Sequence, residues 1–189
     1  MTLHNPMNPR DYSRLRNWQI VKGAYTAAGI VGDLTRYNTP SGYAYDNGVA
    51  ALTGDEPEGY ALGLHDLCHW LIAPKSRKNL PNFGLGPHPT APEEKWAKEV
   101  VGSAINNLEE SAGSLLNVLM AEILFGRDKA HAMGQFLGFN DYPDATNYKR
   151  SVLHLRKHSL LGPNLGDTLT LSLPEPLTAY LRANEHRSG

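Results

Sequence analysis

The sequence predicts a single compact domain of the α+β class, mostly α-helical, with a metal site held between two helices. Apolar residues recur at three- and four-residue steps over the longest patterned stretch of the chain, which is typical of a helix. Two histidines stand four residues apart in an earlier helical stretch, and one segment near the C-terminus alternates like a strand. A length of 189 residues suits one domain, so residues 1–189 are expected to fold as a unit.

Composition excludes several classes of function. The 18 Lys+Arg and 19 Asp+Glu residues leave a net charge of −1, which gives no strong signal for nucleic-acid binding. No apolar run reaches the ~18 residues that a membrane span needs. Cys68 is the single cysteine, so no intrachain disulfide forms, and the pattern suits a reducing compartment. We therefore expect a cytoplasmic protein that acts without a membrane.

The first half of the chain divides into four segments. Residues 10–31 favour a helix, and the Tyr- and Gly-rich residues 35–54 favour short strands or an ordered loop. A helix is expected at about residues 57–73, with a proline in its first turn and apolar residues on most faces, which is typical of a buried helix. Prolines and glycines then predict a loop over residues 74–92.

The second half begins with the longest helical pattern, at about residues 93–125. Further helices are expected at residues 128–137, 145–158 and 177–182, and an edge strand is expected at residues 168–173.

The helix at about residues 57–73 contains the first two candidate metal ligands. His65 and His69 are spaced i, i+4, which places both imidazoles on one helix face, about 5–6 Å apart at Cβ. Their neighbours are mostly apolar, and burying two unsatisfied imidazoles is costly. A shared metal ion would satisfy both, so the pair predicts two metal ligands. Cys68, between them, is expected to be a buried small apolar residue.

A third ligand is expected from the long helix, which carries two adjacent glutamates. At 100° per residue, Glu109 falls beside the apolar stripe of Ile105, Ala112 and Leu116, whereas Glu110 points away from it. Glu109 is therefore the preferred ligand, and Glu110 is kept as the alternative because the helix phase can be wrong by one residue.

These residues resemble a known family. The segment His65-Asp66-x-x-His69-Trp70-x-Ile72-Ala73, followed by Arg77, Asn82-Phe83-Gly84 and a downstream glutamate, is similar to the elongation factor P hydroxylases. The resemblance covers about a third of the chain and implies an Fe(II) monooxygenase or hydroxylase, with His65, His69 and Glu109 or Glu110 as ligands. The chain departs from the family where Asp66 replaces Glu, Pro74 replaces Gly and Asn82 replaces Asp. The acceptor therefore stays open: an unknown protein, a nucleotide or a small molecule.

Alternative functions share the histidine pair. Zinc is also compatible with these ligands. A zinc-dependent hydrolase of the peptidase type would use residue 66 as general base. Asp66 is one methylene shorter than the Glu that usually stands at this position. An HD-domain phosphohydrolase would need an additional upstream histidine, and the candidate, His4, lies close to the N-terminus. The nonenzymatic alternative is a helical binding protein in which the metal is structural.

Two further residues are candidates for catalysis or positioning. Asp66 is placed to orient a ligand histidine or a bound water, and His88, in the loop after the motif, is placed to donate a proton or contact substrate. The charges that follow the motif, Arg77 and Lys78, are expected to be solvated loop charges, with the positioning of a partner as the alternative role. The second i, i+4 histidine pair, His154 and His158, has basic neighbours and is expected to lie on a surface.

Overall fold

Helices form most of the described part of the chain. The computed structural model describes residues 9–30, 58–78, 80–85, 100–136, 145–163 and 168–186. Within these ranges there are six α-helices and one short 3-10 helix. The α-helices are α1 (Pro9–Ala27), α3 (Glu58–Ile72), α4 (Ser103–Phe125), α5 (Arg127–Phe136), α6 (Ala145–Lys157) and α7 (Glu175–Ala183), and the 3-10 helix is η1 (Pro81–Gly84).

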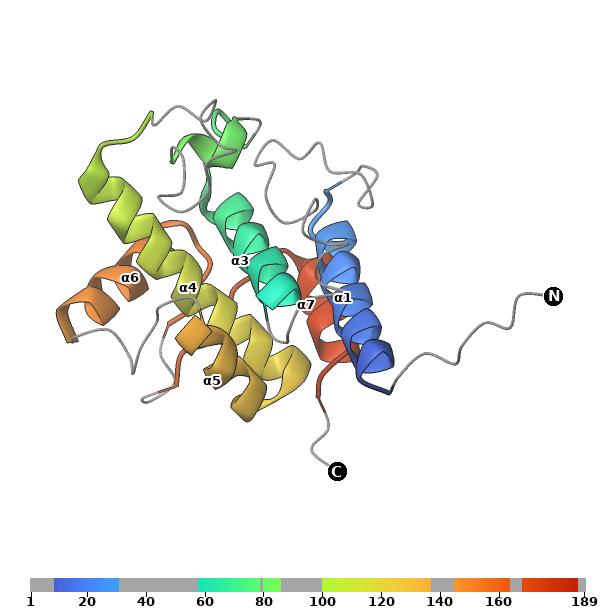
Figure 1. Ribbon diagram of the computed structural model, residues 1–189. Helices are drawn as coiled ribbons and strands as arrows, with labels where there is room; N and C mark the ends of the chain where they lie inside the picture. Colours follow the sequence, from blue (N-terminus) through green and yellow to red (C-terminus); the bar gives the residue numbers. More distant parts are fainter. Residues whose placement is uncertain are drawn as a thin grey trace.

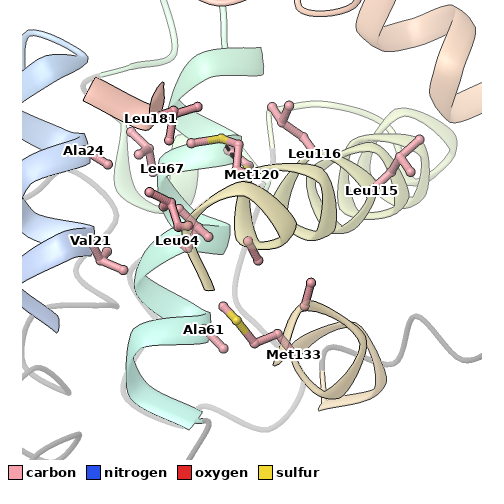
Figure 2. Packing of buried hydrophobic residues seen from close by; sticks show 14 of the residues in the cluster. Val21, Ala24, Ala61, Leu64, Leu67, Leu115, Leu116, Met120, Met133 and Leu181 are labelled. Atoms are coloured by element: carbon pink, nitrogen blue, oxygen red, sulfur yellow. Dashed lines mark hydrogen bonds between the residues drawn. The ribbon is translucent and has the colours of Figure 1, made fainter. Parts of the chain in front are cut away.

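Helix α3 lies at the centre of the fold, between α1 and α4 (Figure 1). Its sequence is apolar on most faces, and Leu64, Leu67 and Cys68 are completely buried. Figure 2 shows Leu64 and Leu67 between side chains of α1 and side chains of α4. The helix expected at residues 57–73 is therefore a core helix, and it holds the two histidines inside the molecule.

Helix α4 connects α3 to the rest of the fold. It packs against α3, α5 and α6, and its buried residues lie on more than one face. Gly126 ends it with a φ of 82°, a left-handed conformation that glycine adopts without strain, and α5 begins at the next residue. The long helix expected at residues 93–125 starts at Ser103, because Val100, Val101 and Gly102 are not helical; residues 93–99 lie outside the described part.

The β component of the expected α+β class is not confirmed. In the described ranges the only β pairing is an isolated antiparallel bridge between Leu161 and Leu171. The edge strand expected at residues 168–173 is thus reduced to one bridge, which is flanked by backbone hydrogen bonds from Gly162 to Thr170 and from Ser172 to Leu160. The Tyr-rich residues 35–54 lie outside the described residues.

The other helices lie close to their expected positions. The segments expected at residues 10–31, 128–137, 145–158 and 177–182 correspond to α1, α5, α6 and α7, with ends that differ by at most four residues. The loop expected at residues 74–92 is described only in part and contains η1. No described helix is long and apolar enough to cross a membrane.

Candidate metal centre

His65 and His69 point from α3 toward α4. Both are buried, and their Nε2 atoms lie 2.9 Å apart. The two rings are nearly perpendicular, with centroids 4.4 Å apart. This is the arrangement that the i, i+4 spacing predicts, because residues four apart lie one above the other on a helix. The two Nε2 atoms converge on one point from the same side.

Glu110 supplies the third group. Its Oε2 atom lies 3.3 Å from Nε2 of His65 and 3.3 Å from Nε2 of His69. The side chain of Glu110 is 43% exposed, whereas that of His69 is 3% exposed. The three residues form a group whose possible ligand atoms all lie within 4.8 Å of one another. The group is therefore buried on the histidine side and reaches solvent on the glutamate side.

Gly113 makes the close approach of the imidazoles to α4 possible. It lies one turn after Glu110, on the face of α4 that meets the histidines. A Cβ atom at this position would lie 3.2 Å from Cε1 of His69 and 3.4 Å from Cε1 of His65. The contact with His69 is tighter than ordinary van der Waals contact, so a side chain here would push that imidazole away from α4 by a few tenths of an ångström. The sequence pattern alone does not indicate this role, because it depends on which face of α4 meets the histidines.

The charges at the site favour an ionised glutamate. Burial alone would raise the pKa of Glu110, but the facing His69 and His65 imidazoles lower the pKa well below its ordinary range. Burial alone would lower the pKa of His69, but the Glu110 carboxylate raises it, with smaller contributions from Asp66 and Glu109. The site is therefore an anionic group facing two imidazoles, which is a donor set suited to a cation.

The spacing of the three donor atoms fits a single transition-metal ion. Metal–nitrogen bonds of about 2.0–2.1 Å place adjacent donors about 2.9 Å apart at right angles and about 3.3 Å apart in a tetrahedron. The measured separations of 2.9 and 3.3 Å fall at this scale. The donor types, two imidazole nitrogens and one carboxylate oxygen, suit iron and zinc alike.

Glu109, the ligand preferred from the sequence, does not join the histidines. Its side chain is 3% exposed, and its Oε1 atom lies 2.5 Å from Nη2 of Arg77. Glu109 lies on a buried face of α4 with Ala112 and Leu116, as the apolar stripe predicts, although Ile105 itself is 47% exposed. Burial alone does not say which element covers a helix face, and the face that meets the histidines has Glu110 and Gly113. The structure brings Glu110 to the histidines in its place.

Arg77 is buried, against the expectation of a solvated loop charge. Its Nη1 atom donates a hydrogen bond of 3.0 Å to the carbonyl oxygen of Phe83, and its other amino group pairs with Glu109. Phe83 has a φ of 52°, which is strained for a residue with a side chain, and its ring stacks on His69 with centroids 6.0 Å apart. The guanidinium thus fixes the Phe83 backbone, and the Phe83 ring covers one side of His69.

The remaining candidates divide into three cases. Asp66 is buried on α3, and its negative charge raises the pKa of His69. His88 lies outside the described residues. His154 is partly buried rather than at the surface, with its Nε2 atom 4.0 Å from Oε1 of Glu109. Cys68 is buried as expected, with its sulfur 4.0 Å from that of Met120, and burial raises the pKa of its thiol.

Comparison with known proteins adds no relative. No protein-family model, curated protein or solved structure matches this chain.

Proposed function

We propose that the protein is a metal-dependent enzyme, a non-haem Fe(II) hydroxylase, whose metal ion is bound between α3 and α4 by His65, His69 and Glu110. The observation that carries this proposal is the convergence of two imidazole Nε2 atoms and one carboxylate oxygen at separations of 2.9 and 3.3 Å. Two histidines and one carboxylate form the ligand set of non-haem Fe(II) oxygenases, in which the other coordination positions stay open.

The sequence around these ligands supports iron over zinc. His65 and His69 belong to the segment that resembles the elongation factor P hydroxylases. A zinc peptidase needs a general base at position 66, where this chain has the shorter Asp66, and a misplacement of about 1 Å can cost about a hundredfold in rate. An iron site of this kind has no such requirement. Bound Fe(II) would supply oxygen activation.

The residues around the ligands have separate roles in this proposal. Phe83 and Arg77 hold His69 on its buried side. The Glu110 side, where the carboxylate is 43% exposed, is the side from which a substrate can approach. Asp66 adds a negative charge near His69, which strengthens the attraction of the site for a cation. The acceptor is a protein side chain, a nucleotide or a small molecule, the three classes that the sequence analysis left open.

Metal analysis tests the proposal. Untagged protein is purified without oxygen, and the metal content per chain is measured for the wild type, His65→Ala and Glu110→Gln. The matched controls are His131→Ala, an exposed histidine on α5, and Glu122→Gln, an exposed glutamate on α4. We expect one iron per chain in the wild type and in both controls, and loss of iron in both site variants.

Oxygen consumption by the iron-loaded protein with a chemical reductant completes the test. We expect consumption that depends on His65 and Glu110. Zinc as the tighter-binding metal, without oxygen consumption, would replace the hydroxylase with the hydrolase or structural alternatives. A wild-type protein that binds neither iron nor zinc would contradict the metal site itself.

A further inference from the structure

A hollow lies near the C-terminal end of α4, away from the histidines. It is bordered by α1, the end of α4, the start of α5 and the segment after α7, which converge in the lower part of Figure 1. Its volume is about 310 Å³, and it continues past Ala183 and Asn184 into a neighbouring space of about 440 Å³. Fourteen residues of helix separate Glu110 from Leu124 in its wall, which is a distance of about 21 Å. The hollow is therefore separate from the candidate metal centre.

The wall of this hollow combines an apolar side with hydrogen-bond donors. Ile20, Leu124 and Phe125 form the apolar side. Arg16 and Lys129 contribute cations, and neither has an ion-pair partner within the described ranges. Among the described residues, no acidic side chain lines the 310 Å³ part, and Glu185 borders only the neighbouring space. Two positive charges thus line a half-enclosed space, and the described residues of the 310 Å³ part include no negative charge.

Asn17 gives a second, independent observation. This residue is 5% exposed and lines the hollow, and its Nδ2 atom has no hydrogen-bond partner among the described residues. A buried amide donor is normally satisfied, because leaving it without an acceptor is costly. The Nδ2 atom itself is almost completely covered, so an acceptor bound in the hollow would satisfy it once the amide turns toward the space that Asn17 lines. The group that can accept from Asn17 and also attract Arg16 and Lys129 is an anion.

We propose that this hollow binds a small organic anion. Its carboxylate or phosphate group accepts hydrogen bonds from Asn17, Arg16 and Lys129, and its apolar body packs against Ile20, Leu124 and Phe125. The volume suits a molecule of metabolite size, and a mostly apolar wall with a few converging polar groups is the usual form of a small-molecule site. This proposal does not depend on the metal centre.

Phenyl phosphate is a suitable probe, because it combines an anion with a small apolar body. Its affinity is measured by protein-observed NMR titration at 150 mM salt, beside phenol as the uncharged probe and inorganic phosphate as the probe without an apolar body. We expect phenyl phosphate to bind at least about tenfold more tightly than either one. Equal affinity for phenol, equal affinity for inorganic phosphate, or no binding of phenyl phosphate would each overturn the proposal.

Variants locate the binding. Arg16→Gln removes an exposed cation, and Asn17→Asp replaces the buried donor with a negative charge of the same shape. Lys149→Gln, an exposed cation on α6 away from the hollow, is the matched control. We expect phenyl phosphate affinity to fall about tenfold in Arg16→Gln and further in Asn17→Asp, with no change in Lys149→Gln.

An unchanged affinity in Arg16→Gln would contradict the proposal. Because Arg16 is exposed, this variant is expected to fold even if Asn17→Asp does not. An equal loss of affinity in Lys149→Gln would show that net charge, not the hollow, attracts the probe, and would overturn the proposal as well.

Discussion

Two adjacent glutamates on α4 lie in opposite surroundings. Glu110 faces the two imidazoles of α3, and its side chain is 43% exposed. Glu109, about 100° away around α4, faces Arg77 and His154 of α6, and its side chain is 3% exposed. Both residues have the same chemistry and are neighbours in sequence, so what separates them is the partner that the fold supplies.

The identity of that partner determines what each carboxylate can do. The Arg77 guanidinium binds the Glu109 oxygen directly, so its positive charge balances this carboxylate within the protein. The histidines facing Glu110 can be neutral, and a neutral imidazole has a lone pair to offer a metal ion. The Arg77 side of α4 is therefore suited to fixing the structure, and the histidine side is suited to binding a ligand.

The largest expected effect comes from breaking the buried pair. Arg77→Ala leaves the Glu109 charge buried without its partner and frees the Phe83 carbonyl, so we expect a loss of about 3–5 kcal/mol in the free energy of unfolding. Glu110→Gln changes a half-exposed group and should cost less than about 1 kcal/mol. Urea denaturation of the metal-free variants measures both.

A double variant tests whether the charge is the cause. Arg77→Met combined with Glu109→Leu replaces the pair with apolar side chains of similar size, and we expect it to recover much of the stability lost in Arg77→Ala. Equal stability losses in Arg77→Ala and Glu110→Gln would mean that the Arg77–Glu109 pair stabilises the fold no more than Glu110 does.

A smaller effect is expected at Gly113, on the histidine side. Gly113→Ala places a Cβ atom 3.2 Å from Cε1 of His69, so the imidazole must shift by a few tenths of an ångström. The alanine also favours the helix by about 1 kcal/mol, which offsets the crowding. We therefore expect nearly unchanged stability and, if the proposed metal site is correct, about tenfold weaker metal binding.

Gly102→Ala is the matched control for Gly113→Ala. Gly102 precedes α4, and a Cβ atom there would meet nothing within 4 Å. Metal affinity is measured by competition with a chelator in both variants. Equal affinities for the two variants would show that Gly113 does not set the position of the imidazoles.

The histidine side was largely predictable from the sequence, because its information is local. The i, i+4 spacing of His65 and His69 places both on one face of any helix, and the apolar neighbours place that helix in the core. The alternation at residues 168–173 predicted an edge strand less reliably, because a strand also needs a pairing partner elsewhere in the chain. The described residues form only one bridge there.

The Arg77 side could not be predicted in the same way. Arg77 and Glu109 are 32 residues apart, and nothing local indicates that they meet. The apolar stripe of α4 predicted that Glu109 is buried, and it is, but the stripe could not indicate which neighbouring element covers that face. A helix buried on more than one face gives a weak phase signal, so the three-dimensional packing had to decide which glutamate faces α3.

The smallest expected effect concerns pH and the Arg77 side of α4. Burial lowers the pKa of His154, and the neighbouring His158, Lys157 and Arg77 lower it further, against an opposite effect of Glu109. The unfolded chain, in which a histidine has a pKa near 6.5, therefore takes up this proton before the folded protein does. Stability contributed by neutral His154 is present above about pH 6.5 and is lost as the pH falls through the folded pKa.

His154→Gln should make the free energy of unfolding less dependent on pH below about 6.5, whereas His131→Gln, an exposed histidine on α5, should leave the slope unchanged. Urea denaturation at a series of pH values measures both slopes, and equal slopes for His154→Gln and the wild type would remove His154 from this account of the Glu109 side.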